Sequence, residues 1–339
     1  MVKRKLTNKQ VRNQAKIQSD RIGRAKQRAQ KIEKALQSSE LGPEQRGLLI
    51  AHFGVHLIVE DEQGNLHQCQ HRQTIGPLVT GDRVIWRTFQ DQTGVIVALE
   101  ERKSLLIKPF GKHDVRPMAS NVDLVVVVVA PLPPPSATTL DRYLVMAELL
   151  HLPCLIVINK IDLLEDEGHQ AFLDHMQVYQ NLGYPWVEAS THTEHGLDEL
   201  KARLQSHTSI LLGQSGVGKS SLISALVPDA DILIGQLSTS SNLGKHTTTA
   251  ARLYHLPKGG DLIDSPGIRR FGLWHLSKEV LIQGFKEFHP FIGACKFRNC
   301  KHIDEPECAL KKAAEQGKIH ARRLQNYHEL LESHARIEK

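Results

Sequence analysis

The sequence predicts a multidomain protein with an N-terminal all-β barrel of the OB-fold type, a central α/β domain and a mostly helical, zinc-binding C-terminal domain. Short strand-like segments separated by turn signals fill residues 38–112. Buried strand patterns then alternate with helical ones over residues 113–275, which is typical of a doubly wound sheet. Residues 276–339 combine a cluster of cysteines and a histidine with a helical pattern. Residues 1–37 form a separate basic extension.

The composition is that of an ordinary globular protein. Of the 339 residues, 40% are hydrophobic and 24% are charged, which excludes a fibrous or wholly disordered chain. No apolar run approaches the ~20 residues of a membrane-spanning helix, and the basic N-terminus lacks the apolar stretch of a secretory signal. Five cysteines are too few for a disulfide scaffold. We therefore expect a cytoplasmic protein without membrane association.

The positive charge is concentrated in the N-terminal extension. Residues 1–37 hold twelve Lys and Arg against two acidic residues, a net charge of +10, whereas the whole chain carries +6 and residues 38–339 carry −4. Such a segment suits a polyanion, because each neutralised phosphate releases a counterion. The extension has no aromatic residue, so base stacking is not expected. A helix stabilised by contact with nucleic acid is the preferred interpretation, and a solvated helix that aids solubility is the alternative.

Five strands are predicted in residues 38–112. Turn signals rich in Gly, Asp and Asn separate them. Their number and short length favour a barrel of the OB type, whereas a small sandwich or an SH3-like barrel has the same periodicity and stays the alternative. The expected strands are Gly47–Phe53, His56–Val59, Leu66–Cys69, Arg83–Arg87 and Val95–Leu99.

In residues 113–275, strands and helices alternate. Asp123–Ala130 and Leu155–Ile158 are continuous apolar runs, as in strands that are buried on both faces of a parallel sheet. Pro131–Pro135 is expected to be a surface connection at a strand end. Further strands are expected at Trp186–Ala189, Ser209–Leu212 and Asp261–Ile263, with helices at Thr139–Leu150, Phe172–Leu182 and Ser221–Leu226.

A phosphate-binding loop follows the strand Ser209–Leu212. The segment 213–220 reads G-x-x-x-x-G-K-S and leads into a predicted helix, which is the structural context that this motif requires. Its glycines let backbone N–H groups converge on phosphate oxygens. Lys219 is expected to reach the β- and γ-phosphates, as a candidate catalytic residue, and Ser220 to bind Mg²⁺. The residues expected to bind nucleotide are Gly213, Gln214, Ser215, Gly216, Val217, Gly218, Lys219, Ser220 and Ser221.

A base-reading motif lies at the end of an earlier strand. The motif N-K-x-D is formed by Asn159, Lys160, Ile161 and Asp162. The Asp162 carboxylate can accept hydrogen bonds from guanine N1–H and N2–H₂, whereas adenine would leave it unpaired. Together with the phosphate loop, the motif indicates GTP rather than ATP. Ser190 and Thr191 occupy a place where backbone N–H groups can face guanine O6, although a plain strand-end turn explains their sequence equally well.

The Mg²⁺ side of the site is expected in two later segments. Asp264 and Gly267 belong to a D-x-x-G motif at a strand end, where Asp264 can hold Mg²⁺ through water and the Gly267 N–H can sense the γ-phosphate. A run of three threonines at 247–249 precedes this motif. One of them can complete the Mg²⁺ shell, and we favour Thr248.

The residue that orients the attacking water is not the glutamine found in many GTPases. Ile268 follows Gly267, and a hydrophobic side chain cannot orient water. His246, beside the threonines, is the best candidate for this catalytic role, and an exposed loop histidine is the alternative. We therefore expect slow turnover by the isolated chain and completion of the site by a partner.

The order of these motifs is circularly permuted. In ordinary small GTPases the phosphate loop precedes N-K-x-D, whereas here Asn159 precedes Gly213. All parts are present but the chain is cut at another point of the same sheet, which predicts a circularly permuted GTPase domain over 113–275. Its switch segments lead directly into the C-terminal region, so the nucleotide state can be passed there.

Four candidate zinc ligands lie in the C-terminal region. Their spacing is C-x4-C-x-H-x5-C, and because all four positions of a tetrahedral site are filled, the zinc is expected to be structural. A redox disulfide or simply buried thiols are the alternatives. Cys69 and Cys154 stand alone and are interpreted as core residues. The expected ligands are Cys295, Cys300, His302 and Cys308.

With these motifs, the chain closely resembles the RsgA (YjeQ/YloQ) family of circularly permuted GTPases. The resemblance rests on N-K-I-D at 159–162, G-Q-S-G-V-G-K-S-S at 213–221, G-K-H-T-T-T at 244–249, D-S-P-G-I-R at 264–269 and the Cys/His set. It implies an OB-fold, a permuted GTPase domain and a zinc domain, with Mg²⁺ bound beside GTP. It also implies a late assembly factor of the small (30S) ribosomal subunit, which binds 16S rRNA, hydrolyses GTP on stimulation by the subunit and then dissociates. We expect a monomer.

Two other functions are compatible with parts of the sequence. A metabolic phosphate-loop enzyme, such as a nucleotide kinase, would need a second substrate site, which no motif indicates. A passive RNA-binding scaffold with a vestigial nucleotide site would not need the full set of phosphate, Mg²⁺ and base residues. The sequence therefore favours a GTPase whose barrel, basic extension and zinc region contact rRNA.

Overall fold

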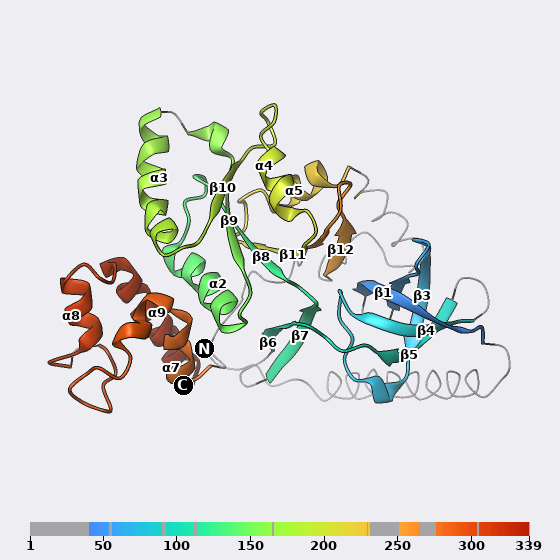
Figure 1. The fold of residues 1–339 in the computed structure, drawn as a ribbon, viewed down its shortest axis with the longest axis horizontal. Coiled ribbons are helices and arrows are strands. Elements are labelled where there is room, and N and C mark those ends of the chain that lie inside the picture. The colour runs from blue at the N-terminus through green and yellow to red at the C-terminus, as the bar shows by residue number, and fades with distance from the viewer. Residues whose placement is uncertain are drawn as a thin grey trace, which may run out of the picture.

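Three parts follow one another along the chain in the structure, which is a computed structural model (Figure 1). The barrel and the C-terminal helices flank the α/β domain on different sides. The basic extension of residues 1–37 lies outside the described residues. Within the described part, none of the helices combines the length and apolar character needed to cross a membrane. The described residues are 41–338 without 54–55, 90–92, 111–113, 165, 229, 231–250, 265–275 and 304.

The first part is a closed five-stranded barrel. The strand order is β1-β2-β3-β5-β4, β4 pairs back with β1, and only the β3–β5 pair is parallel. This closed five-stranded arrangement confirms the predicted OB-type barrel. Each predicted strand is present and is extended by one to three residues. The elements are β1 (Glu44–Phe53), β2 (His56–Glu60), β3 (Leu66–His71), η1 (Gln73–Ile75), β4 (Arg83–Phe89) and β5 (Thr93–Leu99).

A hairpin that the sequence pattern does not predict connects the barrel to the α/β domain. Strands β6 (Leu105–Phe110) and β7 (Asp114–Ser120) form a separate two-stranded sheet. Pro109 and Pro117 interrupt the expected strand pattern, because proline cannot donate to a sheet ladder. The predicted domain boundary between residues 112 and 113 falls between the two strands.

The central domain is a doubly wound sheet in the order β10-β9-β8-β11-β13-β12, with β12 as its antiparallel edge. Every predicted strand and helix of this domain is present, whereas α4 and β12 are too short to show a clear period in the sequence. The elements are β8 (Leu124–Val129), α2 (Ala137–Leu149), β9 (Cys154–Asn159), η2 (Ile161–Leu163), α3 (Asp166–Asn181), β10 (Trp186–Ala189), α4 (Asp198–Leu204), β11 (Thr208–Gly213), α5 (Lys219–Leu226), β12 (Arg252–His255) and β13 (Asp261–Asp264).

Alternate residues of β8 face the two layers of helices. Val125 and Val127 belong to the hydrophobic cluster that contains buried residues of α2 and α3. Leu124 and Val126 belong to the cluster with α4 and α5 on the other face. The strand is therefore buried on both sides, which explains its continuous apolar sequence.

The C-terminal part is mostly helical, as predicted, and it shares a core with the α/β domain. Phe285, Phe288 and Tyr327 are buried in the same cluster as the inner side of α2. Figure 1 shows these helices beside α2 and α3. The elements are α7 (Lys278–Leu281), η4 (Ile282–Gly284), η5 (Lys286–Phe291), α8 (Ala309–Glu315) and α9 (Ala321–Glu338).

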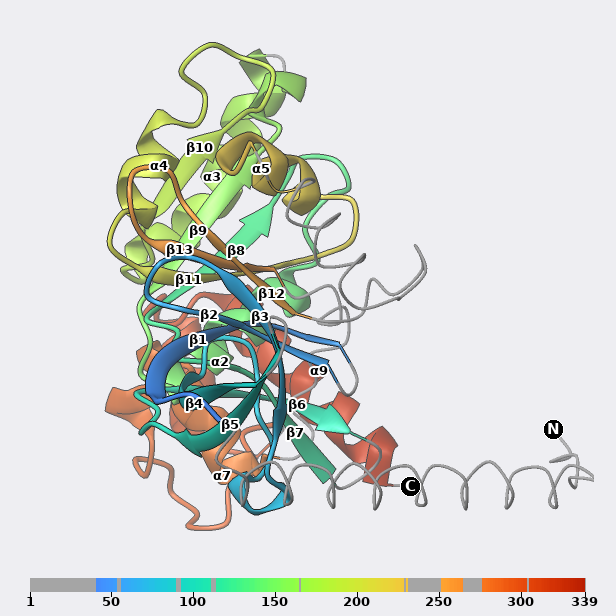
Figure 2. The ribbon, with the colours of Figure 1, turned by 90° about the vertical axis from the view of Figure 1, so that its right-hand side faces the viewer.

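The barrel and the α/β domain are joined by backbone pairing. Ala51 of β1 pairs with Arg252 of β12, so that the barrel strands and the central strands form one eleven-stranded sheet. The Thr80 hydroxyl, on the barrel side, also donates to the Ala251 carbonyl at 2.9 Å. Figure 2 shows β1 and β2 below the central sheet, next to β12. The barrel is thus attached to the strand that follows the predicted threonine run.

Candidate nucleotide and metal sites

The predicted phosphate loop connects β11 to α5, at the carboxyl edge of the parallel strands where doubly wound folds bind ligands. Gly213 (φ +148°) and Gly218 (φ +94°) have backbone conformations that other residues rarely adopt. A Cβ atom would lie 2.4 Å from the Val128 carbonyl oxygen at Gly213, and 2.3 Å from Asn159 Nδ2 at Gly218. No side chain caps the N-terminus of α5. Its first N–H groups are therefore suited to phosphate oxygens.

Lys219 is the first residue of α5, and its side chain reaches across the phosphate loop. Lys219 Nζ donates to the carbonyl oxygens of Gly213 at 2.8 Å and Gln214 at 2.7 Å. Ser220 and Ser221 follow in the first turn of the helix and are exposed. A positive charge and two exposed hydroxyl groups thus border the loop.

The N-K-x-D segment is tied directly to the phosphate loop. Asn159 Nδ2 donates to the Val217 carbonyl at 2.8 Å, and Lys160 Nζ donates to the Gly216 carbonyl at 2.6 Å. Asn159 is 2% exposed, and its Oδ1 has no hydrogen-bond partner among the described residues. Such a buried, unpaired atom is rare in proteins and suits a site that takes a polar ligand.

Ser190, after β10, is brought to Asp162 in η2. Ser190 Oγ donates to Asp162 Oδ1 at 2.5 Å and accepts from the His192 N–H at 3.0 Å. Thr191 follows and is half-buried. The structure thus places the predicted base-reading carboxylate and the predicted Ser190-Thr191 turn side by side. The hydroxyl fixes the orientation of the carboxylate.

The proline-rich segment 131–135 belongs to the site, which the sequence pattern does not predict. Leu132 is 59% exposed, as expected for a surface connection. However, its carbonyl accepts from Lys160 Nζ at 3.1 Å, and Pro133 Cδ lies 3.4 Å from the place of a Cβ on Gly216. The signal that could have found it is its position, because it follows the carboxyl end of the parallel strand β8.

Asp264 lies at the same edge of the sheet. It ends β13, pairs in register with Leu211 of β11 and is half-buried. Leu211 is two residues before Gly213, so Asp264 and the phosphate loop lie at the same edge of the sheet on neighbouring strands. The predicted residues His246, Thr248 and Gly267 lie outside the described residues.

The four predicted zinc ligands converge. Their ligand atoms all lie within 4.8 Å of one another. The sulfur atoms of Cys295 and Cys308 are 3.5 and 3.6 Å from His302 Nδ1. In a tetrahedral site with Zn–S near 2.3 Å and Zn–N near 2.0–2.1 Å, sulfur and nitrogen would be about 3.6 Å apart. The donor set of these residues and Cys300 therefore fits one zinc ion, and all five cysteines are free of disulfides.

The surrounding chain supports this cluster. The Ala309 N–H, at the start of α8, donates to the Cys295 sulfur at 3.3 Å. His328 Nε2 of α9 donates to the His302 carbonyl at 2.5 Å. A metal held by the cluster would thus fix both α8 and α9.

The two remaining cysteines are core residues, as predicted. Cys69 lies inside the barrel and Cys154 at the start of β9, both buried. Burial removes water from the thiolate and raises the pKa of both thiols, that of Cys154 to about 12. Both are therefore neutral and poorly reactive at neutral pH.

Comparison with known proteins gives one consistent answer. The sequence profile of the family described as RsgA GTPase matches residues 99–274. The "Small ribosomal subunit biogenesis GTPase RsgA" of Hahella chejuensis is 48% identical, over 98% of this chain and 97% of that protein. The protein of the same name from Dickeya dadantii is 47% identical, over 99% of this chain and 97% of that protein.

Two solved structures have the same fold. The crystal structure of YjeQ from Thermotoga maritima matches with a TM-score of 0.69 and 34% identity, over 86% of this chain and 99% of that chain. A structure described as YloQ, a circularly permuted GTPase, matches with a TM-score of 0.66 and 29% identity, over 86% of this chain and 96% of that chain. The strand order and the order of motifs thus agree with a circularly permuted GTPase.

Proposed function

This chain belongs to the RsgA family of GTPases, and we propose that it is a late assembly factor of the small (30S) ribosomal subunit. In this proposal it binds 16S rRNA, hydrolyses GTP when the subunit stimulates it and then dissociates. GTP hydrolysis is the activity that the family match indicates. The small subunit is the target named for relatives that are 47–48% identical over almost the whole chain.

One observation supports the nucleotide assignment most directly: hydrogen bonds join the phosphate loop to the base-reading segment. Asn159 holds Val217, and Ser190 orients Asp162 so that its carboxylate can accept from guanine N1–H and N2–H₂. An adenine would present an acceptor to this carboxylate, which favours GTP. We assign nucleotide binding to Asn159, Lys160, Ile161, Asp162, Ser190, Thr191, Gly213, Gln214, Ser215, Gly216, Val217, Gly218, Lys219, Ser220 and Ser221.

We assign the hydrolytic roles from the position of Lys219 and, for the other residues, from the sequence motifs. Lys219, already held at the loop, would neutralise charge that develops on the β- and γ-phosphates. Ser220, Thr248 and Asp264 would hold Mg²⁺, which when bound withdraws charge from the phosphate oxygens. We assign γ-phosphate sensing to the Gly267 N–H and the orientation of the attacking water to His246.

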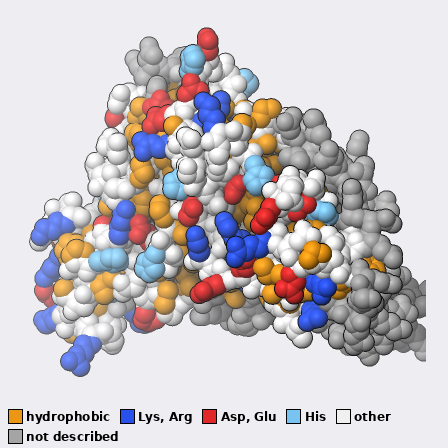
Figure 3. Space-filling model, turned by 45° about the vertical axis from the view of Figure 1, so that its right-hand side comes forward, with side chains coloured by type: hydrophobic (Ala, Val, Ile, Leu, Met, Phe, Trp, Pro, Cys, Tyr) orange, Lys and Arg blue, Asp and Glu red, His pale blue; other side chains and the backbone are white. Residues whose placement is uncertain are grey.

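We assign the RNA contacts to the barrel, the basic extension of residues 1–37 and the zinc region. Figure 3 shows Lys and Arg mixed with Asp and Glu over the visible face of the described residues. Such a surface suits shape-specific contact with RNA more than general electrostatic attraction to phosphates. The extension of residues 1–37, with a charge of +10, would supply the general attraction. In the zinc domain, exposed Phe297 lies among Lys296, Arg298 and Lys301 and offers an aromatic surface to a base. We place this monomeric factor in the cytoplasm, where small subunits are its partner.

The decisive experiment measures GTP hydrolysis by the full chain alone, with small subunits, with large subunits and with free RNA. We expect slow turnover alone and a large stimulation by small subunits only. Lys219→Ala should abolish the stimulated rate. Rapid turnover without ribosomes would instead indicate an ordinary phosphate-loop enzyme, and no turnover with small subunits would indicate a passive scaffold.

The guanine assignment has its own test. Asp162→Asn should lower the affinity for GTP relative to ATP, because an amide cannot accept from both guanine donors at once. Asp174→Asn is the matched control, since Asp174 lies on the exposed surface of α3, where its carboxylate accepts a hydrogen bond from Gln170 Nε2 at 2.7 Å. An unchanged preference for GTP in Asp162→Asn would contradict the assignment.

A further inference from the structure

A buried network of charges joins α2 of the GTPase domain to the C-terminal domain. Arg323 of α9 donates to Asp141 Oδ1 of α2 at 2.6 Å and to both carboxylate oxygens of Glu287, at 2.6 and 3.2 Å. Asn326 Nδ2 donates to Asp141 Oδ2 at 2.6 Å. The side chains of Asp141 and Arg323 are 0% and 1% exposed. The network therefore lies entirely inside the contact between the two domains.

The network is stable only while its members stay together. Burial opposes the positive charge on Arg323, but the carboxylates of Asp141 and Glu287 outweigh this effect and raise its pKa. The Phe285 ring also lies 4.6 Å below the guanidinium carbon. Removing one partner would leave a buried charge without compensation, which is strongly unfavourable. The position of α2 against α9 is thus narrowly defined.

The side of α2 that bears Asp141 makes further contact with α9. Thr138 lies one turn before Asp141 and donates to Glu329. Near the other end of α2, a Cβ on Gly284 would lie 2.4 Å from Val145 Cγ1, so only a glycine allows η4 to approach the helix this closely. The C-terminal domain therefore contacts α2 along most of its length.

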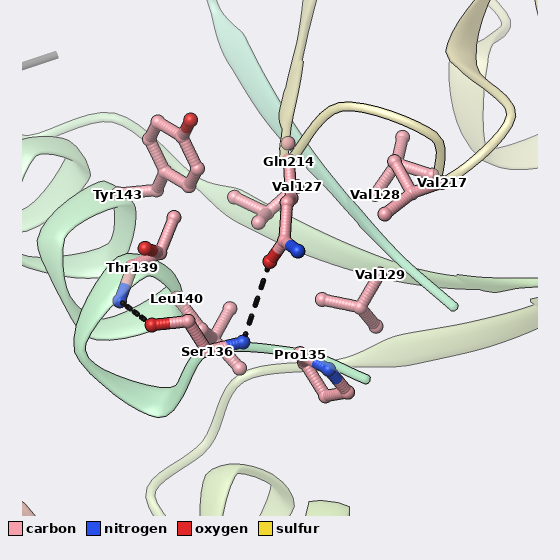
Figure 4. Close-up of a pocket in the computed structure, with 11 residues that line it drawn as sticks. Val127, Val128, Val129, Pro135, Ser136, Thr139, Leu140, Tyr143, Gln214 and Val217 are labelled. Atoms are coloured by element: carbon pink, nitrogen blue, oxygen red, sulfur yellow. Dashed lines mark hydrogen bonds between the residues drawn. The ribbon is translucent and has the colours of Figure 1, made fainter. Parts of the chain in front are cut away.

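A different side of α2 faces the phosphate loop. Figure 4 shows Gln214 of the loop reaching toward Ser136, whose N–H donates to Gln214 Oε1 at 3.5 Å. Ser136 also caps α2, because its Oγ accepts from the Thr139 N–H. Leu140 and Tyr143 line one narrow pocket together with Gly213, Gln214 and Val217. Every shift of α2 would thus alter the packing under the loop.

We propose that Asp141 and Arg323 are positioning residues for the nucleotide site, acting by fixing α2 between α9 and the phosphate loop. The C-terminal domain and bound nucleotide then stabilise each other through α2. This inference rests on the proposed nucleotide site. It adds a route through described residues of α2 to the one that is expected through the switch segments. A partner that displaced α9 would weaken nucleotide binding.

The first test compares the affinity of zinc-loaded full-length variants for fluorescently labelled GDP with Mg²⁺. Arg323→Met should weaken binding about five-fold or more, the lower range of typical couplings between sites, and Arg323→Lys should restore part of it. Arg322→Met is the matched control. It removes a guanidinium from the same turn of α9, but Arg322 contacts His175 of α3 rather than α2. We expect its affinity to stay within about two-fold of the wild type.

The second test is the reciprocal one and uses the wild-type chain. Because coupling between α9 and the nucleotide site is mutual, saturating GDP should slow hydrogen exchange of the α9 amides. Unchanged exchange of α9 would overturn the proposal even if Arg323→Met fails to fold. A folded Arg323→Met variant with a loosened α9 and an unchanged affinity for GDP would also overturn the proposal. In that case Arg323 would only stabilise the C-terminal domain. Failure of the wild-type chain to bind GDP would contradict the proposed function itself.

Discussion

The two contacts that the GTPase domain makes with its neighbours differ in how their charged side chains are exposed. The barrel contact includes the β1–β12 pairing, the Thr80–Ala251 hydrogen bond, an exposed bridge from His255 to Glu60, and apolar packing of Ile50 and Phe53 in one cluster with Leu253. The C-terminal contact consists of the Asp141–Arg323 network and a shared aromatic core. Side-chain exposure is 51% for His255 and 1% for Arg323. The charged side chains of the barrel contact are therefore hydrated, although its apolar part is buried, whereas the charges of the Asp141–Arg323 network are dry.

The two contacts also reach different parts of the nucleotide site. The barrel contact acts on β12, whose residue Arg252 pairs with Asp264, the proposed Mg²⁺ ligand. The C-terminal contact acts on α2, which lies under the phosphate loop. An exposed ion pair can rearrange at a small cost in free energy. Removing one partner from a buried network of charges is strongly unfavourable, because a buried charge is left without compensation. The comparison predicts graded effects at the barrel and large effects at the C-terminal domain.

Zinc removal should have the largest effect, and only on the C-terminal side. Treatment with a strong chelator, or Cys308→Ser, should release α8 and α9, because metal binding in such small clusters supplies about 10–16 kcal/mol in isolated peptides. Zinc content is measured by mass spectrometry and loosening by hydrogen exchange. Barrel amides in the same sample are the internal control. A purified chain that lacks zinc and still protects α9 would contradict the assignment.

Asp141→Ala should have the next largest effect. It leaves Arg323 buried with one carboxylate fewer, and we expect a loss of about 3–5 kcal/mol in the stability of the C-terminal contact. The loss is measured from hydrogen exchange of α9 in increasing urea. Asp198→Ala, at an exposed position of α4, is the control and should cost under about 0.5 kcal/mol. Equal losses in both variants would show that the network does not hold the contact.

The features that were predictable from sequence are those encoded within short segments. The phosphate loop needs glycines at fixed spacing, and Gly213 and Gly218 show why, since a Cβ at either would clash. The five barrel strands and the parallel strands follow from local alternation and apolar runs. The zinc set lies within fourteen residues, and its convergence follows from that closeness.

The features that were not predictable depend on pairing between distant segments. Asp141 and Arg323 are separated by 182 residues, and neither stands out in its helix, because a charged residue on a helix is usually exposed. Leu132 acts through its backbone carbonyl, which leaves no signal in the sequence. The hairpin β6–β7 and the strand β12 are defined by their partners rather than by their own pattern.

At the barrel contact, Thr80→Val should have a moderate effect. Thr80 is 1% exposed, and valine has nearly the same shape but cannot donate to the Ala251 carbonyl. We expect a loss of about 1–2 kcal/mol, because the carbonyl is left without its partner. Thr138→Val is the matched control, since that hydroxyl is at the exposed rim of the other contact. Exchange of the Arg252 amide reports the loss, and no difference between the two variants would show that the bond is dispensable.

The smallest effect should be a pH dependence of the barrel contact at His255. Hydrogen bonds that the His255 imidazole donates to Asp261 and then to Glu60 raise its pKa to about 10, against about 6.5 in an unfolded chain. Since the folded pKa is the higher one, the stabilisation is complete below about pH 6.5 and is lost as the pH rises through 10. Half of the side chain is exposed, so the effect should stay below about 1 kcal/mol. The measurement is the difference in free energy of unfolding between wild type and His255→Gln at pH 6, 8 and 10. The contributions of other titrating groups cancel in this difference. A stability difference that does not shrink as the pH rises would mean that His255 stabilises the barrel contact as a neutral side chain. The barrel contact would then have no titrating ion pair to compare with the buried Arg323 network.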